Sequence, residues 1–165
     1  MREIKFRGKR SDNGEWVYGD LLQEPNMCKD TYWIIGKGTI SFKSKEEDIL
    51  DFIKEAYNKV NKETIGQYTG LKDKNGTEIY EGDIVTGIDY PFIYEGKQNY
   101  IGIVEFYEDV AQFLFTLKCV NKNIAGISNG FSNEFEANKN LVCEDLEVIG
   151  NIHENPELLE VKDET

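Results

Sequence analysis

Several residue types that carry much of protein chemistry are scarce in this sequence. Its 165 residues include one histidine, three cysteines and three prolines. A Ser-His-Asp catalytic triad or a Cys-His dyad would have to use the single histidine, His153. A lone histidine near an acidic tail is typically a surface residue. One histidine and three scattered cysteines also lack the ligand spacing of a zinc site. We therefore expect no catalytic residues, no metal and no cofactor.

The three cysteines (Cys28, Cys119 and Cys143) stand far apart, and their number is odd. This pattern favours reduced thiols over disulfides, and therefore the cytoplasm. No basic-then-apolar leader opens the chain, and its apolar runs are far too short to span a bilayer. The sequence thus predicts a cytoplasmic protein with no membrane contact.

Basic residues are outnumbered, and they are distributed unevenly. The chain has 31 acidic and 19 basic side chains, a net charge of −12, which argues against general nucleic-acid binding because phosphate contact depends on Lys and Arg. The opening thirteen residues carry five basic and two acidic side chains, a net of +3, so the remainder carries −15. One interpretation is a basic strand that binds an anion; the other is that its arginines pair with the chain's own carboxylates. The basic residues of this segment are Arg2, Lys5, Arg7, Lys9 and Arg10, and they include all the arginines of the chain.

The hydrophobic pattern has mostly the two-residue period of strands. In residues 3 to 10 (EIKFRGKR), apolar and charged side chains alternate, as in a strand with one buried face. Asp12-Asn13-Gly14 then supplies a turn, since Asn-Gly tolerates positive φ angles. Residues 15 to 22 (EWVYGDLL) read as the return strand. The sequence therefore predicts a β-hairpin at its start.

One segment has helical periodicity instead. In residues 45 to 60, apolar side chains recur at three- and four-residue steps, which produces one apolar stripe. Ser44 and Glu47 match a capping box at its start. We expect an amphipathic helix that packs on a sheet or, alternatively, presents its stripe to a partner. Two short strands, at 33 to 35 and 40 to 42, are predicted before it.

After this segment nearly every apolar run is short and β-like. Strands are predicted at residues 65 to 68, 78 to 80, 84 to 88, 100 to 107, 112 to 120 and 146 to 152. Two polar connections, residues 89 to 99 and 121 to 140, contain aromatic side chains, and loops of this length are often functional. The candidate binding surface therefore consists of Phe92, Tyr94, Phe131 and Phe135, together with Arg2, Arg7 and Arg10.

The stretch GQYTGLKDKNGTEIYEGDIV, residues 66 to 85, is the densest in turn residues. As a calcium loop it fails, because Gly76 at the sixth position would make Leu71 the first ligand and Gly82 the twelfth. Glu81 and Asp83 would share a strand face, but their charges would repel each other without a cation between them. A series of corners between short strands explains the stretch better, as in small barrels.

The same stretch carries a resemblance. The run TIGQYTGLKDKNG (64 to 76), continued by IYEGDIV (79 to 85), resembles the signature of the YopX protein family. The opening MREIKFR and the closing EVIGNIHENP are similar to the two ends of that family, and the match is weaker in residues 23 to 63. The resemblance implies a protein of bacteriophages and prophages of low-GC Gram-positive bacteria, with an SH3-type barrel in its C-terminal part and no catalytic residues.

Together these patterns predict a mainly β protein, α+β overall. We expect an N-terminal hairpin-and-helix lobe (1 to 63), an SH3-like barrel (64 to 153) and an acidic tail (154 to 165). The expected function is that of a non-catalytic phage accessory protein that binds an unknown host or phage protein. The alternatives are a nucleic-acid role, through the basic N-terminal strand or through acidic DNA mimicry, and an enzyme whose pocket the sequence does not reveal. Self-association through open strand edges is a separate expectation.

Overall fold

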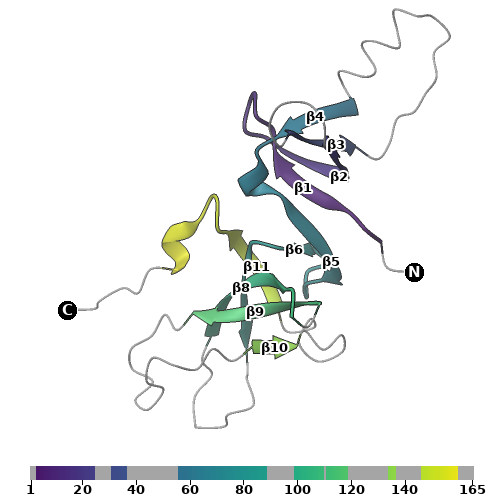
Figure 1. Ribbon diagram of the computed structural model, residues 1–165. Coiled ribbons are helices and arrows are strands. Elements are labelled where there is room, and N and C mark those ends of the chain that lie inside the picture. The colour runs from purple at the N-terminus through teal and green to yellow at the C-terminus, as the bar shows by residue number, and fades with distance from the viewer. Residues whose placement is uncertain are drawn as a thin grey trace, which may run out of the picture. The chain divides into compact units, whose positions relative to one another are not determined.

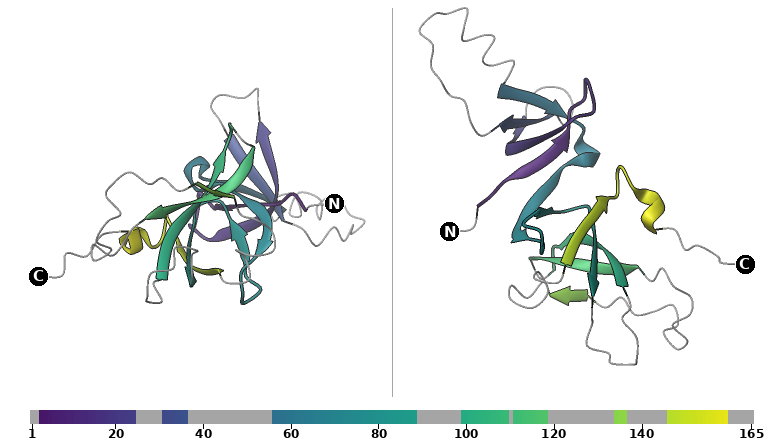
Figure 2. Two further views of the ribbon diagram at one scale, coloured as in Figure 1. Left: turned by 90° about the horizontal axis from the view of Figure 1, so that it is seen from below. Right: turned by 180° about the vertical axis from the view of Figure 1, so that it is seen from behind.

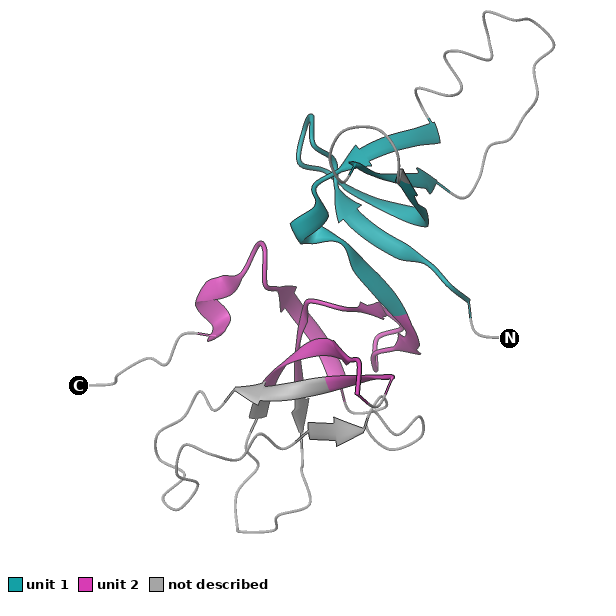
Figure 3. Cartoon of the chain, viewed as in Figure 1, with its two compact units in different colours: residues 1–68 teal, residues 69–165 magenta. Residues whose placement is uncertain are grey.

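A computed structural model of the protein describes residues 3–24, 31–36, 56–88, 99–109, 111–118, 134–136 and 146–159. Figure 1 and Figure 2 show the chain from three directions. Figure 3 colours its two compact units, Met1–Tyr68 (unit 1) and Thr69–Thr165 (unit 2). The sequence placed this division between residues 63 and 64. The described residues form antiparallel strands with two 3₁₀ turns and no longer helix, so this protein is mainly β.

Unit 1 is built on one antiparallel sheet. Its strands are β1 (Phe6–Lys9), β2 (Trp16–Glu24), β3 (Thr31–Gly36), β4 (Tyr57–Val60) and the first part of β5 (Gly66–Lys72), which the 3₁₀ turn η1 (Lys62–Thr64) precedes. Their order in the sheet is β4-β3-β2-β1-β5, as the labels in Figure 1 show. β5 continues into unit 2, where β6 (Glu78–Tyr80) is its neighbour.

The predicted opening hairpin is confirmed. β1 pairs with β2 in a register that sets Lys9 opposite Trp16. At the turn, the Arg10 amide donates to the Glu15 carbonyl at 2.9 Å. Gly14 adopts a φ of +74° there, an angle that glycine reaches without steric cost. Alternation on both strands and one glycine were therefore enough to specify this element.

The helix predicted over residues 45–60 is wrong at its C-terminal end. Residues 57–60 form β4, which pairs with β3 so that Tyr57 lies opposite Ile35. Exposed and buried side chains alternate along β4, which is the period of a strand. The pairing with β3 is a tertiary contact that decides between two local patterns, as is common for strand propensity. Residues 45–55 lie outside the described residues.

β4 also returns to the end of β1. Val60 bridges back to the residue after β1, and the Asn61 amide donates to the Lys9 carbonyl at 2.9 Å. Ile34 and Val60 are buried within this curl of strands. A Cβ added to Gly8 of β1 would lie 3.1 Å from the Val60 Cβ. The described part of the unit 1 core is therefore tightly filled around Gly8.

Unit 2 contains the second antiparallel sheet, which is open. Its strands are β7 (Asp83–Ile88), β8 (Asn99–Tyr107), β9 (Gln112–Lys118), β10 (Glu134–Glu136) and β11 (Leu146–Asn151), and the turn η2 (Pro156–Leu159) follows them. Their order is β10-β9-β8-β7-β11. A buried apolar cluster in this unit comprises Ile79, Val85, Val104 and Leu146.

The strands predicted after residue 64 are confirmed, with small shifts at their ends except for β5, which continues to Lys72 instead of ending at residue 68. β10 is a correction, because the sequence assigned residues 121–140 to a loop. Most of the other predicted loop (89–98) and the strand predicted at 40–42 lie outside the described residues. In the described part of the chain, no helix is long and apolar enough to cross a membrane.

The 66–85 stretch forms corners at 73–76 and 81–82 as predicted, whereas the corner predicted at 69–71 lies within β5. Gly70, Gly76 and Gly82 have φ angles of +87°, +84° and +80°, a region that costs other residues strain energy. Gly70 lies within β5, Gly76 closes the turn at 73–76, and Gly82 precedes β7. The density of glycines in this stretch therefore reflects backbone geometry.

We expect Gly82→Val to lower the free energy of unfolding by roughly 1–3 kcal/mol, because valine would be strained at this φ. The backbone cannot easily rotate away, since the Gly82 amide donates to the Val104 carbonyl at 2.8 Å and the Ile152 amide donates to the Gly82 carbonyl at 2.9 Å. Thermal unfolding followed by far-ultraviolet circular dichroism measures the effect. Gln112→Val, at an exposed strand position, is the control, and equal melting temperatures for the two variants would contradict the prediction.

Candidate functional site

Asp73 is a buried carboxylate in the middle of the 66–85 stretch, and its contacts are structural. Its Oδ1 accepts hydrogen bonds from the amides of Asn75 and Thr77, both at 2.8 Å. Its Oδ2 accepts from the Val148 amide of β11 at 3.0 Å. Burial by itself would raise the pKa of Asp73, but the amide hydrogen bonds, led by that of Val148, hold the pKa below its ordinary value of 3.8. Asp73 thus closes a turn and ties it to β11.

Asp83 is also part of the framework. Its side chain is 1% exposed, and its Oδ2 accepts from the Tyr80 amide at 2.7 Å. This bond spans the corner that leads into β7, as a short polar side chain does in a turn. Among the described residues, no three His, Cys, Asp or Glu side chains are grouped as metal ligands would be.

His153 lies in the turn after β11. Its backbone amide donates to Asn151 Oδ1 at 3.0 Å, and the Glu154 amide donates to the same oxygen at 3.0 Å. These contacts stabilise the turn without using the imidazole. The sequence also contains GISNG at residues 126–130, which has the GxSxG spacing of a hydrolase nucleophile and runs against the expectation of no catalytic residues. It lies outside the described residues.

The main grouping of potential binding side chains is on unit 1. Strand alternation places Lys5, Arg7 and Lys9 on one face of the sheet. Trp16 lies opposite Lys9, and Tyr18 lies opposite Arg7, so both aromatic residues share that face. Further along β2 and on β4 the same face contains more apolar side chains. We define the basic–aromatic face as Lys5, Arg7, Lys9, Trp16, Tyr18, Leu22 and Tyr57.

The cations of this face lie over aromatic rings. The Arg7 guanidinium carbon is 4.8 Å from the centre of the Trp16 ring, and Lys9 Nζ is 5.4 Å from it. Lys5 Nζ lies 5.6 Å from the ring centre of Tyr68, on β5. Contacts of this kind contribute about 0.5–1 kcal/mol each at exposed sites. They keep three long side chains in an ordered positive stripe along β1.

Large apolar side chains are exposed beside this stripe. Tyr18 and Leu22 on β2 are 46% and 44% exposed, and Tyr57 on β4 is 37% exposed. Ile35 lies opposite both Asp20 and Tyr57, which puts Tyr57 on the same face as the alternating positions of β2. The sheet of unit 1 therefore has apolar side chains on both faces, and the buried Ile34 and Val60 lie on the other face.

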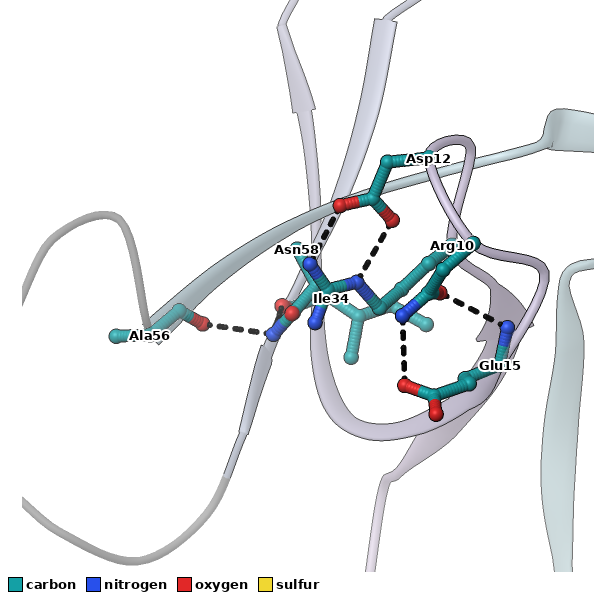
Figure 4. Close-up of polar contacts among 7 residues, drawn as sticks. Arg10, Asp12, Glu15, Ile34, Ala56 and Asn58 are labelled. Carbon is teal, nitrogen blue, oxygen red and sulfur yellow. Dashed lines mark hydrogen bonds and ion pairs between the residues drawn. The ribbon is translucent and has the colours of Figure 1, made fainter.

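Arg10 does not contribute to the stripe. Its Nε and Nη2 donate to the two carboxylate oxygens of Asp12 at 2.9 and 2.6 Å, as drawn in Figure 4. This hydrogen-bonded pair raises the pKa of Arg10 and lowers that of Asp12. For Arg10, the structure shows pairing with a carboxylate of the chain itself.

The structure leaves most of the other predicted site residues undescribed. Phe135 belongs to β10, and its side chain is outside the description. Arg7 is the predicted residue that does lie on the face. The predictions that fall outside the described residues are Arg2, Phe92, Tyr94 and Phe131.

The sequence contained a signal for the aromatic half of the face. The pattern Lys-x-Arg-x-Lys on one strand of the hairpin lies across from Trp-x-Tyr on the other. A hairpin register alone is enough to bring these two patterns together. The basic residues were recognised, whereas Trp16 and Tyr18 were missed as their neighbours.

Comparison with known proteins places the chain in a family. No curated protein matches it. Among solved structures, the crystal structure of protein EF1440 from Enterococcus faecalis is similar, with 26% sequence identity over 97% of this chain and 100% of that chain and a TM-score of 0.49. Residues 5–160 match the family described as YopX protein, a range that takes in the 66–85 stretch and confirms the resemblance found in the sequence. The chain therefore belongs to the YopX protein family.

Proposed function

We propose that this chain is a non-catalytic accessory protein of phage origin, which acts in the host cytoplasm by binding another protein. The observation that supports this most is the basic–aromatic face, where Tyr18, Leu22 and Tyr57 are each more than a third exposed. Exposed apolar patches on soluble proteins are typical of interaction sites. Trp, Tyr and Arg, all present on this face, are the residue types that dominate the energetics of protein–protein interfaces.

Two features favour a protein over a nucleic acid as the partner. Single strands bind by stacking bases on aromatic rings, and the ring of Trp16 already has the cations of Arg7 and Lys9 over it. The net charge of −12 also repels phosphate, since duplex affinity comes from many Lys and Arg contacts. Nucleic-acid binding through the basic strand is therefore the weaker candidate.

Acidic DNA mimicry is a second candidate function, and the charge distribution favours it. Residues 14–165 carry a net charge of −15, which is −12 less the +3 of the first thirteen residues. A mimic would occupy the DNA site of a host protein through its carboxylates. Mimicry predicts that duplex DNA displaces this chain from its partner in a competition assay, whereas binding through the basic–aromatic face predicts no competition.

The proposal includes an SH3-type barrel in unit 2. It is supported by the family resemblance, by the short strands β6 and β7, and by the positive φ angles of Gly76 and Gly82 at the corners beside them. Glycine corners of this kind let short strands bend sharply enough for a small barrel. In this arrangement unit 2 is the scaffold, and unit 1 presents the contact surface.

Comparative affinity capture tests the protein-binding function. The full chain, a Tyr18→Ser/Leu22→Ser variant and an Ile152→Ser variant are each immobilised and exposed to lysate of a low-GC Gram-positive bacterium. We expect one or more proteins to be retained by the wild type and lost by the double variant, because it removes the exposed apolar side chains of the face. Ile152 is 37% exposed on unit 2 and serves as the control for loss of an exposed apolar side chain elsewhere.

Retention of the same proteins by all three baits would contradict this function. Circular dichroism spectra that match the wild type show that each variant is folded. Both substituted positions of the double variant are partly exposed, so we expect little change in stability.

A further inference from the structure

We propose that the basic–aromatic face binds an acidic segment of the partner protein in extended conformation. This segment has a central apolar residue with one carboxylate on each side of it. The acidic partner deepens the protein-binding function proposed above and rests on it. The charges of β1 and the apolar side chains beside them specify this chemistry.

Positive charge is concentrated on this face in a chain that is acidic elsewhere. Among the side chains that the structure describes on this face of β1–β4, Arg7, Lys9 and Lys59 are cationic and Asp20 is acidic. Ahead of β1, the same alternation adds the cationic Lys5 and the acidic Glu3. Complementary charges across an interface guide the encounter and fix its register. A partner surface that is complementary to this face therefore carries carboxylates.

A short segment fits better than a folded acidic domain. Outside the first thirteen residues the chain carries −15, which would repel a large acidic body. Charges act over about 8–10 Å at physiological ionic strength. A segment brings only a few carboxylates within that distance, and these meet the lysines of β1.

The spacing of the lysines specifies the segment. Lys5 and Lys9 are half-buried, whereas Arg7 between them is 7% exposed and lies over Trp16. The lysines therefore make the direct contacts, and Arg7 holds the indole in place. Strand residues rise about 3.3 Å each, so Lys5 and Lys9 are roughly 13 Å apart along β1. An extended chain with carboxylates four residues apart has the same spacing, and its middle residue would lie against Tyr18, which is opposite Arg7 and 46% exposed.

A synthetic peptide with this pattern is the probe. In the capped peptide Gly-Glu-Thr-Leu-Thr-Glu-Gly, two glutamates four residues apart flank a leucine. We expect its titration into the ¹⁵N-labelled full chain to shift the Trp16 indole and the amides of β1, and to saturate. An analogue with glutamine at both glutamate positions, and a reordered peptide with adjacent glutamates, should each bind about fivefold more weakly, because one or both charge contacts are lost.

Matched charge variants locate the site. Lys5→Gln/Lys9→Gln is expected to weaken binding of the glutamate peptide about fivefold. Lys72→Gln/Lys74→Gln removes the same charge from exposed positions of unit 2 and should leave the affinity unchanged. Retained dispersion of the amide spectrum shows that the variants fold.

Four results would contradict the proposal that the partner segment is acidic. Equal affinity for the glutamate and glutamine peptides would show recognition by shape alone, and the protein-binding function would stand. Shifts of the same amides by an oligothymidylate of about eight nucleotides, at lower concentration than by the peptide, would indicate a nucleic acid. Concentration-dependent shifts without any probe would show that a second copy covers the face. If no peptide shifts the resonances of these amides, the proposal of an acidic segment is wrong. The protein-binding function is contradicted as well only if the Tyr18→Ser/Leu22→Ser variant retains the same lysate proteins as the wild type.

Discussion

Replacing Gly19 by alanine is expected to lower the free energy of unfolding of unit 1 by about 3 kcal/mol or more, a large effect for one methyl group. Gly19 lies on β2 opposite Gly36 of β3. A Cβ at position 19 would collide with the backbone carbonyl of Ile35. A backbone atom in a paired strand cannot move aside as the end of a flexible side chain can, so the methyl group must push β2 and β3 apart.

Tryptophan fluorescence measures this effect selectively. Trp16 and Trp33 are the two tryptophans of the chain, and both belong to unit 1, so their emission during urea unfolding reports on that unit. Gly36→Ala is the matched control, because its nearest neighbouring atom would be the Tyr18 carbonyl oxygen at 4.0 Å, and we expect its effect to stay within about 0.5 kcal/mol. Equal urea midpoints for the two alanine variants would refute the prediction.

The need for glycine at position 19 could not have been predicted from the sequence. Gly14 and Gly76 follow asparagine in recognisable turns, so their positive φ angles were expected from local pattern. Gly19 sits inside a strand, where glycine usually only weakens pairing. Its role depends on how closely β3 approaches, and that distance is a property of the folded sheet.

The difference between a local sequence pattern and a contact made only in the folded sheet also explains why a helix was predicted where β4 forms. The stripe that predicted a helix includes Tyr57 and Val60, which in β4 lie on opposite faces, Tyr57 exposed and Val60 buried. Short segments of this kind suit either period, and residues 31–36, far away in sequence, decide the outcome by pairing with them. The opening hairpin was predictable because both of its strands and its turn are contiguous.

Part of the basic–aromatic face was predictable because it lies on the contiguous opening hairpin. The alternation of Lys5, Arg7 and Lys9 is visible in the sequence, and the hairpin register that adds Trp16 follows from the turn. Tyr68, whose ring lies under Lys5, is brought there by the pairing of β1 with β5. Nothing local to either residue indicates that contact.

Asp73→Ala is expected to destabilise unit 2 by about 3 kcal/mol, because it removes a carboxylate that accepts hydrogen bonds from three amides. Asn75 and Thr77 are exposed, so water can satisfy their amides in part. The amide of Val148, a partly buried residue of β11, depends more strongly on Asp73. Native-state hydrogen exchange should therefore show the largest loss of protection at Val148, and unchanged protection there would contradict the structural role of Asp73.

Asp73→Asn separates the turn from the tie to β11. Asparagine keeps one carbonyl oxygen, which can still accept from Asn75 and Thr77, but its NH₂ group would meet the Val148 amide donor to donor. We expect a smaller loss of stability than for Asp73→Ala, again with faster exchange at Val148. Equal losses for the two variants would show that the amide oxygen does not maintain the turn.

The dependence of this loss on pH follows from the pKa of Asp73. Hydrogen bonds lower that pKa in the folded state below the ordinary 3.8, so the unfolded chain binds the proton more readily. The stabilisation is therefore fully present at pH values above the unfolded pKa and is lost as the pH falls through the folded pKa. We expect the stability difference between the wild type and Asp73→Asn to be constant from about pH 5 to 7 and to shrink below about pH 4. A difference that stayed constant down to pH 2 would show that the hydrogen bonds do not depend on the charge of Asp73.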